Sequence, residues 1–155
     1  FARRQRQMCI RDRDNESESV VMFENELNTD FLDNSNYKHA YFCLLSNDER
    51  QVEISQKNII YKESVVDNLT KEVSCNMKKI NGSQLISLVQ SNDNVHLVYP
   101  GAGDNLDFIN KNLMPNANSF IRRKEDIFCY QFSNKGFFNF KKNIPRIISE
   151  LNLSK

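Results

Sequence analysis

The sequence predicts an α/β fold in which helices flank a mostly parallel sheet. Short apolar runs that suit buried strands alternate along the chain with segments whose apolar residues recur at helical spacing. One such run, Val95–Tyr99, ends in the turn Pro-Gly-Ala-Gly, which leads directly into an acidic helix start. Strands that alternate with helices form layered folds with parallel strands, so the fold class follows from the order of the elements.

Residues 1–13 are set apart, because Arg3–Asp12 (RRQRQMCIRD) resembles a translated sequencing-library adapter and Arg13 continues the match. We expect this leader to be non-native, rather than a basic nucleic-acid-binding arm or a targeting peptide. The remaining residues, 14–155, then form a single α/β domain or a C-terminal domain fragment, and we expect this domain to be incomplete.

Without the leader the chain is weakly acidic. The leader holds five of the 21 Lys and Arg but one of the 20 Asp and Glu, so the remainder has a net charge of −3. This balance gives no support to a strongly basic surface for nucleic acid. No run approaches the roughly 18 apolar residues of a membrane-spanning helix. Cys43, Cys75 and Cys129 form no C-x-x-C pair, which argues against disulfides or a zinc site and for a reducing, cytoplasmic location.

The first predicted elements are a helix at Ser19–Phe31 and a strand within Tyr37–Ser46. The helix is predicted from apolar residues at every third or fourth position. The strand is predicted from a nearly continuous apolar, aromatic-rich run, which is typical of strands buried on both faces. His39 and Cys43 would share a face of this strand. One interpretation is that Cys43 is a catalytic nucleophile and His39 its base. We prefer the interpretation that both are ordinary sheet residues, because such catalysis also needs a group that orients the base.

The next elements are a strand or two at Gln51–Tyr61 and then two helices. Ser64 and Asp67 fit a capping box, and apolar residues follow at spacings of three and four over residues 65–80. A second, shorter helix is predicted at Ser83–Gln90, after an Asn-Gly break.

The C-terminal part of the chain repeats the alternation of strands and helices. Val95–Tyr99 is the expected central strand, and Asp104–Leu113 is the helix after the glycine turn. Strands are predicted at Ser119–Ile121 and Ile127–Phe132, and a closing helix at Ile144–Leu153.

The glycine turn is the best candidate for a ligand site. In open, Rossmann-like parallel sheets, ligands bind outside the carboxyl ends of the strands, near a switch in strand order. Gly101 and Gly103 permit positive φ and let a ligand approach the backbone, and the helix opening at Asp104 directs free N–H groups there. Asp104 and Asp107 would each repel a phosphate, by about 4 kcal/mol per close pair at an effective dielectric near 20. The turn therefore suits an ammonium or hydroxyl-bearing ligand, unless it is purely structural.

The segment LVYPGAGDNLDF, followed by PNANSFI, resembles the first motif of class I S-adenosylmethionine-dependent methyltransferases. In that family a strand runs into a glycine turn that meets the methionine portion of the cofactor, and an acid at the end of the next strand holds the ribose. The resemblance covers roughly a fifth of the chain. It implies S-adenosylmethionine as cofactor and the following binding residues: Gly101, Ala102, Gly103 and Asp104 at the turn, with Glu125 or Asp126 at the ribose.

Two other functions fit parts of the sequence. The chain could be the C-terminal, nucleotide-sugar-binding half of a glycosyltransferase, with residues 122–124 at the diphosphate. It could instead be a non-catalytic binding domain that stacks on single-stranded nucleic acid, although aromatic residues near a helix start more often belong to the core. The residues concerned are Phe137, Phe138, Phe140, Lys141 and Lys142. No metal-ligand spacing and no catalytic acid, base or nucleophile is evident.

Overall fold

The computed structural model describes residues 19–25, 27–29, 32, 37–73, 75–92, 94–113 and 120–152. The leader expected at residues 1–13 lies outside them. The chain divides into two compact units, Phe1–Ile121 and Arg122–Lys155. Each unit is described by itself.

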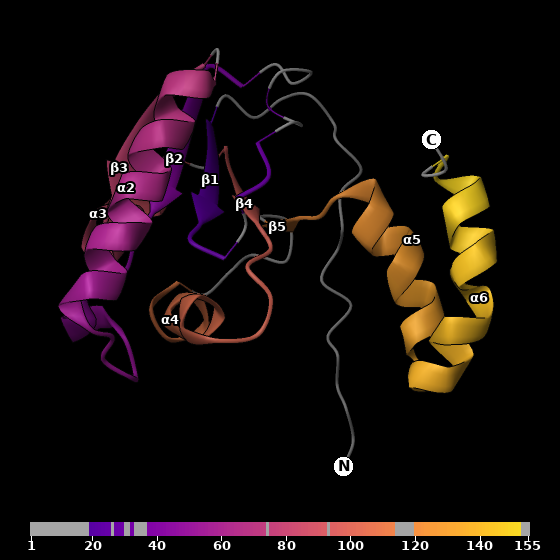
Figure 1. The fold of residues 1–155 in the computed structure, drawn as a ribbon. Coiled ribbons are helices and arrows are strands. Elements are labelled where there is room, and N and C mark those ends of the chain that lie inside the picture. The colour runs from indigo at the N-terminus through magenta and orange to yellow at the C-terminus, as the bar shows by residue number, and fades with distance from the viewer. Residues whose placement is uncertain are drawn as a thin grey trace. The chain divides into compact units, whose positions relative to one another are not determined.

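The first unit contains a five-stranded sheet in which every strand pairing is parallel (Figure 1). The strand order is β3-β2-β1-β4-β5, so β1 lies at the centre and the chain runs outward on both sides of it. The predicted α/β class with a Rossmann-like sheet is therefore confirmed. The strands are β1 (Ser19–Phe23), β2 (His39–Cys43), β3 (Asn76–Ile80), β4 (Val95–Val98) and β5 (Phe120–Ile121).

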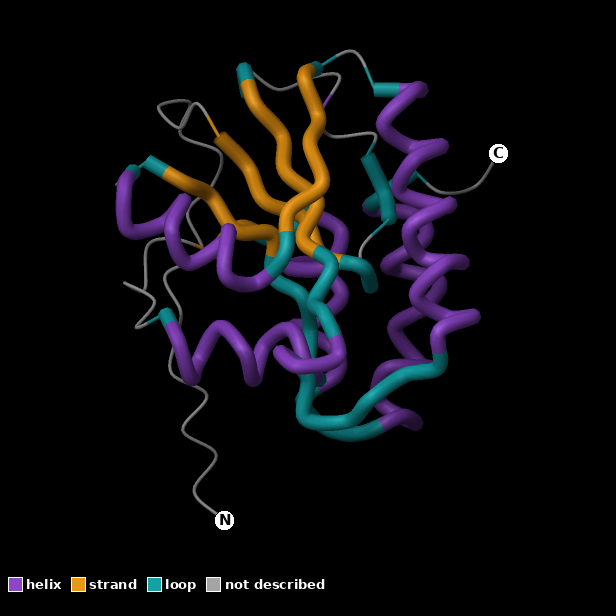
Figure 2. The backbone as a smooth tube through the Cα atoms, turned by 90° about the vertical axis from the view of Figure 1, so that its left-hand side faces the viewer, coloured by secondary structure: helices purple, strands orange, loops and turns teal. Residues whose placement is uncertain are grey.

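Helices cover both faces of this sheet (Figure 2). Helix α2 (Gln56–Glu72) packs Val66 and Leu69 on the face formed by Val20, Met22, Ala40 and Phe42. Helices α3 (Gly82–Ser91) and α4 (Asp104–Asn112) cover the other face, where the core includes Val21, Phe23, Leu85, Leu97 and Ile109. Alternate residues of β1 thus enter two different apolar cores, as expected for a parallel strand covered on both faces.

The helix predicted at Ser19–Phe31 is wrong, because its first part is strand β1. The four consecutive apolar residues from Val20 to Phe23 are all fully buried. A continuous apolar run is the pattern of a central parallel strand, whereas the spacing to Leu27 and Phe31 only imitated a helix. The strand within Tyr37–Ser46 is confirmed as β2.

The strands predicted at Gln51–Tyr61 are also wrong, since α2 begins at Gln56. Its N-cap is Ser55, whose hydroxyl accepts a hydrogen bond from the Asn58 amide, and Ser64 lies inside the helix. The helix predicted over residues 65–80 ends at Glu72, and β3 takes up its last five residues. Two lysines in this edge strand hid its pattern, although lysine is common on such edges.

Three later predictions for the first unit are confirmed. The helix predicted at Ser83–Gln90 is α3, the one at Asp104–Leu113 is α4, and the strand at Ser119–Ile121 corresponds to β5. The strand predicted at Val95–Tyr99 is β4, but the central position that we expected for it belongs to β1. Strand β4 lies beside the central strand instead, so its carboxyl end is next to that of β1.

The second unit consists of helices α5 (Lys124–Ser133) and α6 (Phe137–Glu150). The strand predicted at Ile127–Phe132 is wrong, because a short aromatic run does not distinguish a strand from a helix. The closing helix is confirmed but starts seven residues earlier than the predicted Ile144. Phe137 and Phe138 are 69% and 78% exposed, so the expectation that they belong to the core is also wrong.

None of the helices formed by the described residues has the length and apolar content that a membrane crossing requires.

Candidate functional site

The glycine turn lies at the switch in strand order. The chain passes from β1 to β2 and β3 on one side, and α3 then returns it to β4 on the other side of β1. The crevice between β1 and β4 is therefore where a ligand is expected in an open parallel sheet. Glu24 and Asn25 follow the carboxyl end of β1, and Pro100–Gly103 follows that of β4. The sequence placed the turn correctly at a strand end but gave no indication of its neighbour.

Both glycines of the turn adopt positive φ, with values of 73° at Gly101 and 134° at Gly103. This backbone conformation is costly for residues that carry a Cβ. Among the described residues, a Cβ built at Gly103 would meet nothing within 4 Å, and one at Gly101 would meet only the Asn25 amide nitrogen at 3.9 Å. Close packing against this part of the chain therefore requires neither glycine. Gly103 is also the N-cap of α4, so the turn presents open backbone at a helix start.

A buried ion pair lies beside the turn. The Arg50 guanidinium donates from Nη1 to Glu24 Oε1 at 2.8 Å and from Nη2 to Glu24 Oε2 at 2.5 Å. The two side chains are only 3% and 6% exposed. Lys62 Nζ, from α2, donates to the same Oε1 at 2.8 Å. Arg50 also donates from Nε to the Leu45 carbonyl, which fixes the plane of the guanidinium.

The ion pair shifts the acid–base behaviour of both partners. Burial alone would raise the pKa of Glu24, but the hydrogen bonds from Arg50 and Lys62 outweigh it and lower that pKa. The hydrogen bond to Glu24 raises the pKa of Arg50. Arg50 Nη1 also lies 3.7 Å from Asp104 Oδ2, which connects the pair to the start of α4. Glu24, Arg50, Lys62 and Asp104, here called the edge cluster, carry balanced charges.

Two asparagines join the ends of β1 and β4. The Asn25 amide nitrogen donates to the Pro100 carbonyl of the turn. The Asn105 amide nitrogen, from the first turn of α4, donates to Asn25 Oδ1 at 3.4 Å. The glycine turn is thus attached to the loop after β1 by side-chain hydrogen bonds.

The nominated residues of the glycine turn are consecutive in the sequence. Gly101, Ala102, Gly103 and Asp104 follow β4 and lead into α4. Their role at a cofactor stays a prediction. Glu125, nominated for the ribose, is exposed in the first turn of α5, in the second unit. That nomination stays a prediction.

Sequence reasoning missed Glu24, Asn25, Arg50, Lys62 and Asn105. A signal existed for the first two, because they follow the apolar run of β1 and would have been placed at a strand end had that run been interpreted as a strand. Arg50 and Lys62 join Glu24 from 26 and 38 residues away, and no local pattern encodes such pairings.

The geometry of β2 does not support a catalytic pair in which Cys43 is the nucleophile and His39 the base. His39 is exposed at the start of the strand and Cys43 is buried at its end. Burial, together with the charges of Glu49 and Glu24, raises the pKa of the Cys43 thiol, so the reactive thiolate is disfavoured. These are ordinary sheet residues, as preferred from the sequence.

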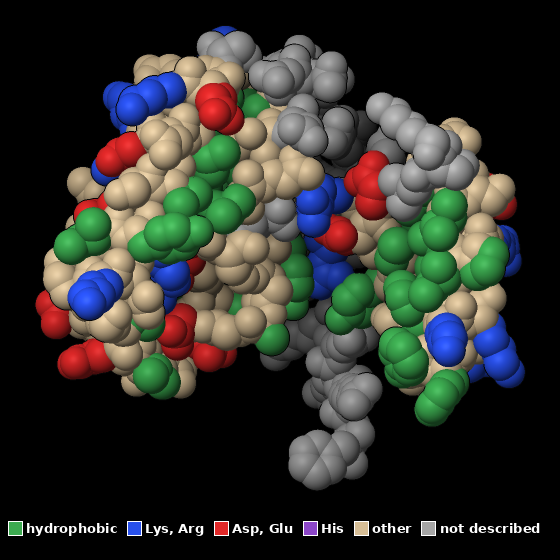
Figure 3. All heavy atoms as spheres, in the orientation of Figure 1, with side chains coloured by type: hydrophobic (Ala, Val, Ile, Leu, Met, Phe, Trp, Pro, Cys, Tyr) green, Lys and Arg blue, Asp and Glu red, His purple; other side chains and the backbone are tan. Residues whose placement is uncertain are grey.

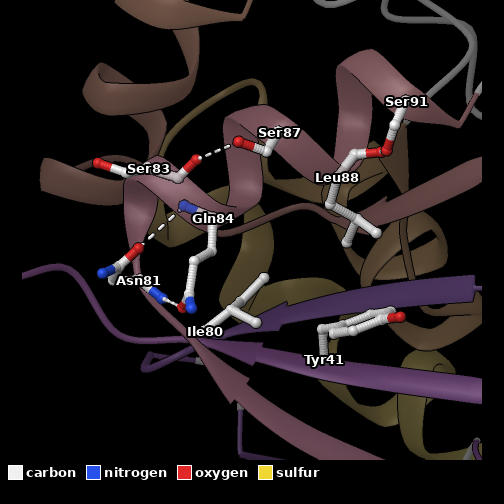
Figure 4. Close-up of a pocket in the computed structure, with 8 residues that line it drawn as sticks. All are labelled: Tyr41, Ile80, Asn81, Ser83, Gln84, Ser87, Leu88 and Ser91. Carbon is white, nitrogen blue, oxygen red and sulfur yellow. Dashed lines mark hydrogen bonds between the residues drawn. The ribbon is translucent and has the colours of Figure 1, made fainter.

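A hollow of about 470 Å³ lies beside α3, away from the glycine turn (Figure 4). Its polar groups bind one another: Asn81 and Gln84 form a capping box, and the Ser87 hydroxyl donates to the Ser83 carbonyl. These contacts stabilise the helix and leave the hollow a weaker candidate than the crevice. It is lined by Tyr41, Ile80, Asn81, Ser83, Gln84, Ser87, Leu88 and Ser91.

Comparison of the chain with protein-family models, curated proteins and solved structures finds no match.

Proposed function

We propose that the first unit binds a nucleoside-bearing ligand without net negative charge in the crevice between β1 and β4. S-adenosylmethionine is the first candidate, and transfer of its methyl group is the proposed reaction. The observation that carries this proposal is the position of an open glycine turn at the switch in strand order. The sequence resemblance of the turn to the methyltransferase motif supplies the identity of the cofactor.

The charges near the turn favour this class of ligand over a phosphate. The edge cluster contributes no net charge, because Arg50 and Lys62 are matched by Glu24 and Asp104. Asp107 then adds a carboxylate in the first turn of α4, where an anion would otherwise bind. A sulfonium or ammonium group meets favourable charges here, whereas a diphosphate would be repelled.

The glycines and the carboxylate of the turn each have a proposed role in binding the ligand. Gly101 and Gly103 allow close approach of the ligand to the backbone, and Asp104 is placed to accept a hydrogen bond from a hydroxyl or an ammonium. Arg50 Nη1 lies 3.7 Å from Asp104 Oδ2, and this contact limits the rotamers of that carboxylate. When bound, S-adenosylmethionine would supply an electrophilic methyl group.

Substitution of Gly103 tests the proposal, and Gly136 supplies a matched control. Both glycines are helix N-caps with positive φ, and a Cβ at either position meets nothing within 4 Å. Gly103→Ala and Gly136→Ala should therefore carry a similar backbone cost of about 1–2 kcal/mol. Only the first places a methyl group on the proposed path of the ligand.

Thermal shift and calorimetry with S-adenosylhomocysteine, UDP and CMP give the readout. At a ligand concentration one hundred times the Kd, binding to the folded state adds about 2.7 kcal/mol of stability. We expect S-adenosylhomocysteine to stabilise the native chain and Gly136→Ala but not Gly103→Ala. A response to UDP or CMP alone would favour the nucleotide-sugar alternative. An equal response of both variants to S-adenosylhomocysteine would refute the site.

A further inference from the structure

We propose that Asn105 Oδ1 is the specificity-determining acceptor of the crevice and takes a hydrogen bond from a hydroxyl or amino group of the ligand. This inference rests on the proposed function and specifies what the ligand must present. It would make Asn105 a binding residue that no motif in the sequence indicates.

The environment of the Asn105 side chain is unusual for a buried amide. The residue is 5% exposed, and its Oδ1 accepts no hydrogen bond from any of the residues that the structure describes. Its amide nitrogen is already used, since it donates to Asn25 Oδ1 at 3.4 Å. Most buried side-chain polar atoms have a partner, so an acceptor without one indicates a missing donor.

The position of this acceptor connects it with the glycine turn. Asn105 lies in the first turn of α4, two residues after Gly103, and its amide reaches across to the loop after β1. Asn25 in turn donates to the Pro100 carbonyl, so the amide pair joins the loops that follow β1 and β4. The unpaired oxygen thus belongs to the side chain that joins the start of α4 to these two loops.

The chemistry of a carbonyl oxygen restricts the ligand. Oδ1 can only accept a hydrogen bond, so a hydroxyl, amino or ammonium group satisfies it and a phosphate or carboxylate oxygen does not. The neighbouring Asp104 carboxylate is likewise only an acceptor when ionised. Acceptors at two consecutive positions of the first turn of α4 therefore favour a donor-rich ligand. In a nucleoside such as S-adenosylhomocysteine, the donors are the ribose hydroxyls and the amino group.

A binding role and a structural role of Oδ1 predict different effects of Asn105→Leu on ligand affinity. If Oδ1 serves the ligand, the affinity should fall, and if it does not, the affinity should stay unchanged. The Tm of the ligand-free protein does not separate the two roles, because the leucine removes both the unsatisfied oxygen and the hydrogen bond from the amide nitrogen to Asn25 Oδ1. Asn110→Leu is the matched control, because Asn110 is an exposed residue on the same helix.

The test is a double-mutant cycle measured by calorimetry on the full chain. The probes are S-adenosylhomocysteine, an analogue without the ribose hydroxyls and an analogue without the amino group. We expect one analogue to bind the native chain about tenfold more weakly than the parent compound. Asn105→Leu should bind the parent about tenfold more weakly and show no further loss with that analogue. Asn110→Leu should match the native chain.

Three outcomes overturn the inference, and they are distinguishable. If the native chain binds S-adenosylhomocysteine and Asn105→Leu binds it equally well, the acceptor role is wrong and the proposed function stands. If the native chain binds none of the probes, the proposed function fails and the inference fails with it. The analogues also test the native chain directly, so the cycle remains informative if Asn105→Leu folds poorly: equal binding of all three probes would count against the acceptor.

Discussion

Glu24 is the residue on which the charge balance of the crevice depends. It is nearly buried and accepts hydrogen bonds from both Arg50 and Lys62. A buried pair of this kind is no guarantee of stability, but removing one partner leaves the other charge uncompensated in a poorly solvated place. Among the described residues, Arg50 would then have only the more distant Asp104 as a carboxylate partner.

The lowered pKa of Glu24 predicts how stability depends on pH. Its folded pKa lies below its unfolded value of about 4.3, so its contribution is complete above that pH and disappears as the pH falls through the folded pKa. Glu24→Gln should lower the free energy of unfolding at pH 7 by about 3 kcal/mol and flatten the acid limb of the stability curve. Urea unfolding at a series of pH values down to the acid transition measures both effects.

Glu49→Gln is the control for this experiment, because the pKa of Glu49 is also lowered. That variant should keep the part of the acid limb that Glu24 supplies. A Glu24→Gln chain with the native acid limb would contradict the assigned role of the ion pair.

At the residue scale, the sequence could predict the glycines but not their partners. Gly101, Gly103 and Asp104 form a contiguous motif, and their residue types alone indicate an open turn and a helix start. Asn105 stands out because its buried Oδ1 accepts no hydrogen bond from the described residues. Only the three-dimensional structure reveals this. No local pattern distinguishes Arg50 in the sequence, and its role becomes evident only when the fold places it on Glu24.

At the element scale, the start of α3 illustrates how the loop after β2 supports the fold. Glu49 Oε2 accepts from the Gly82 amide at 3.0 Å, and Oε1 accepts from the Ser83 amide at 2.8 Å. The carboxylate thus satisfies two of the free N–H groups of the helix and complements its dipole. A Cβ at Gly82 would lie 2.5 Å from Phe108 Cζ and 2.8 Å from Glu49 Cδ, so a larger residue here would displace one of these side chains.

We predict that Glu49→Ala destabilises the protein by about 1–2 kcal/mol, as the loss of a helix cap does elsewhere. Glu53→Ala, an exposed acid in the same loop, should change stability by less than about 0.5 kcal/mol. Chemical denaturation of both variants measures the difference. Equal losses of stability in the two variants would mean that the removal of a negative charge, and not the loss of the contact with α3, destabilises the protein.

The helices that were predicted correctly follow clear turn residues, whereas the wrongly predicted segments have sequences that favour another class of element. Helices α3 and α4 follow Asn-Gly and Gly-Ala-Gly breaks, and those turn residues marked their starts. The edge strand β3 has a polar sequence, and α5 has an aromatic-rich run, so local preference pointed to the wrong class in both. Tertiary contacts decide such segments, and a single sequence does not encode them locally.

At the scale of the whole molecule, the two units have opposite charge. Residues 1–121 contain 13 Lys and Arg and 17 Asp and Glu, whereas residues 122–155 contain 8 and 3. The net charges of −4 and +5 follow from these counts. The field of the first unit therefore favours a neutral or cationic ligand, in agreement with the local charges at the crevice. In the second unit, hydrophobic side chains gather on the surface beside Lys and Arg (Figure 3).

The proposed ligand site is inferred mainly from the topology of the sheet, in which the strand order switches between β1 and β4, and not from any one residue. The most direct test is an NMR titration of the isotope-labelled full chain with S-adenosylhomocysteine. We predict chemical-shift changes concentrated at the amides of Gly101 and Gly103 and at the side-chain amides of Asn25 and Asn105. Changes confined to α3 or to the second unit, or none at all, would contradict a ligand site at the carboxyl edge of the sheet.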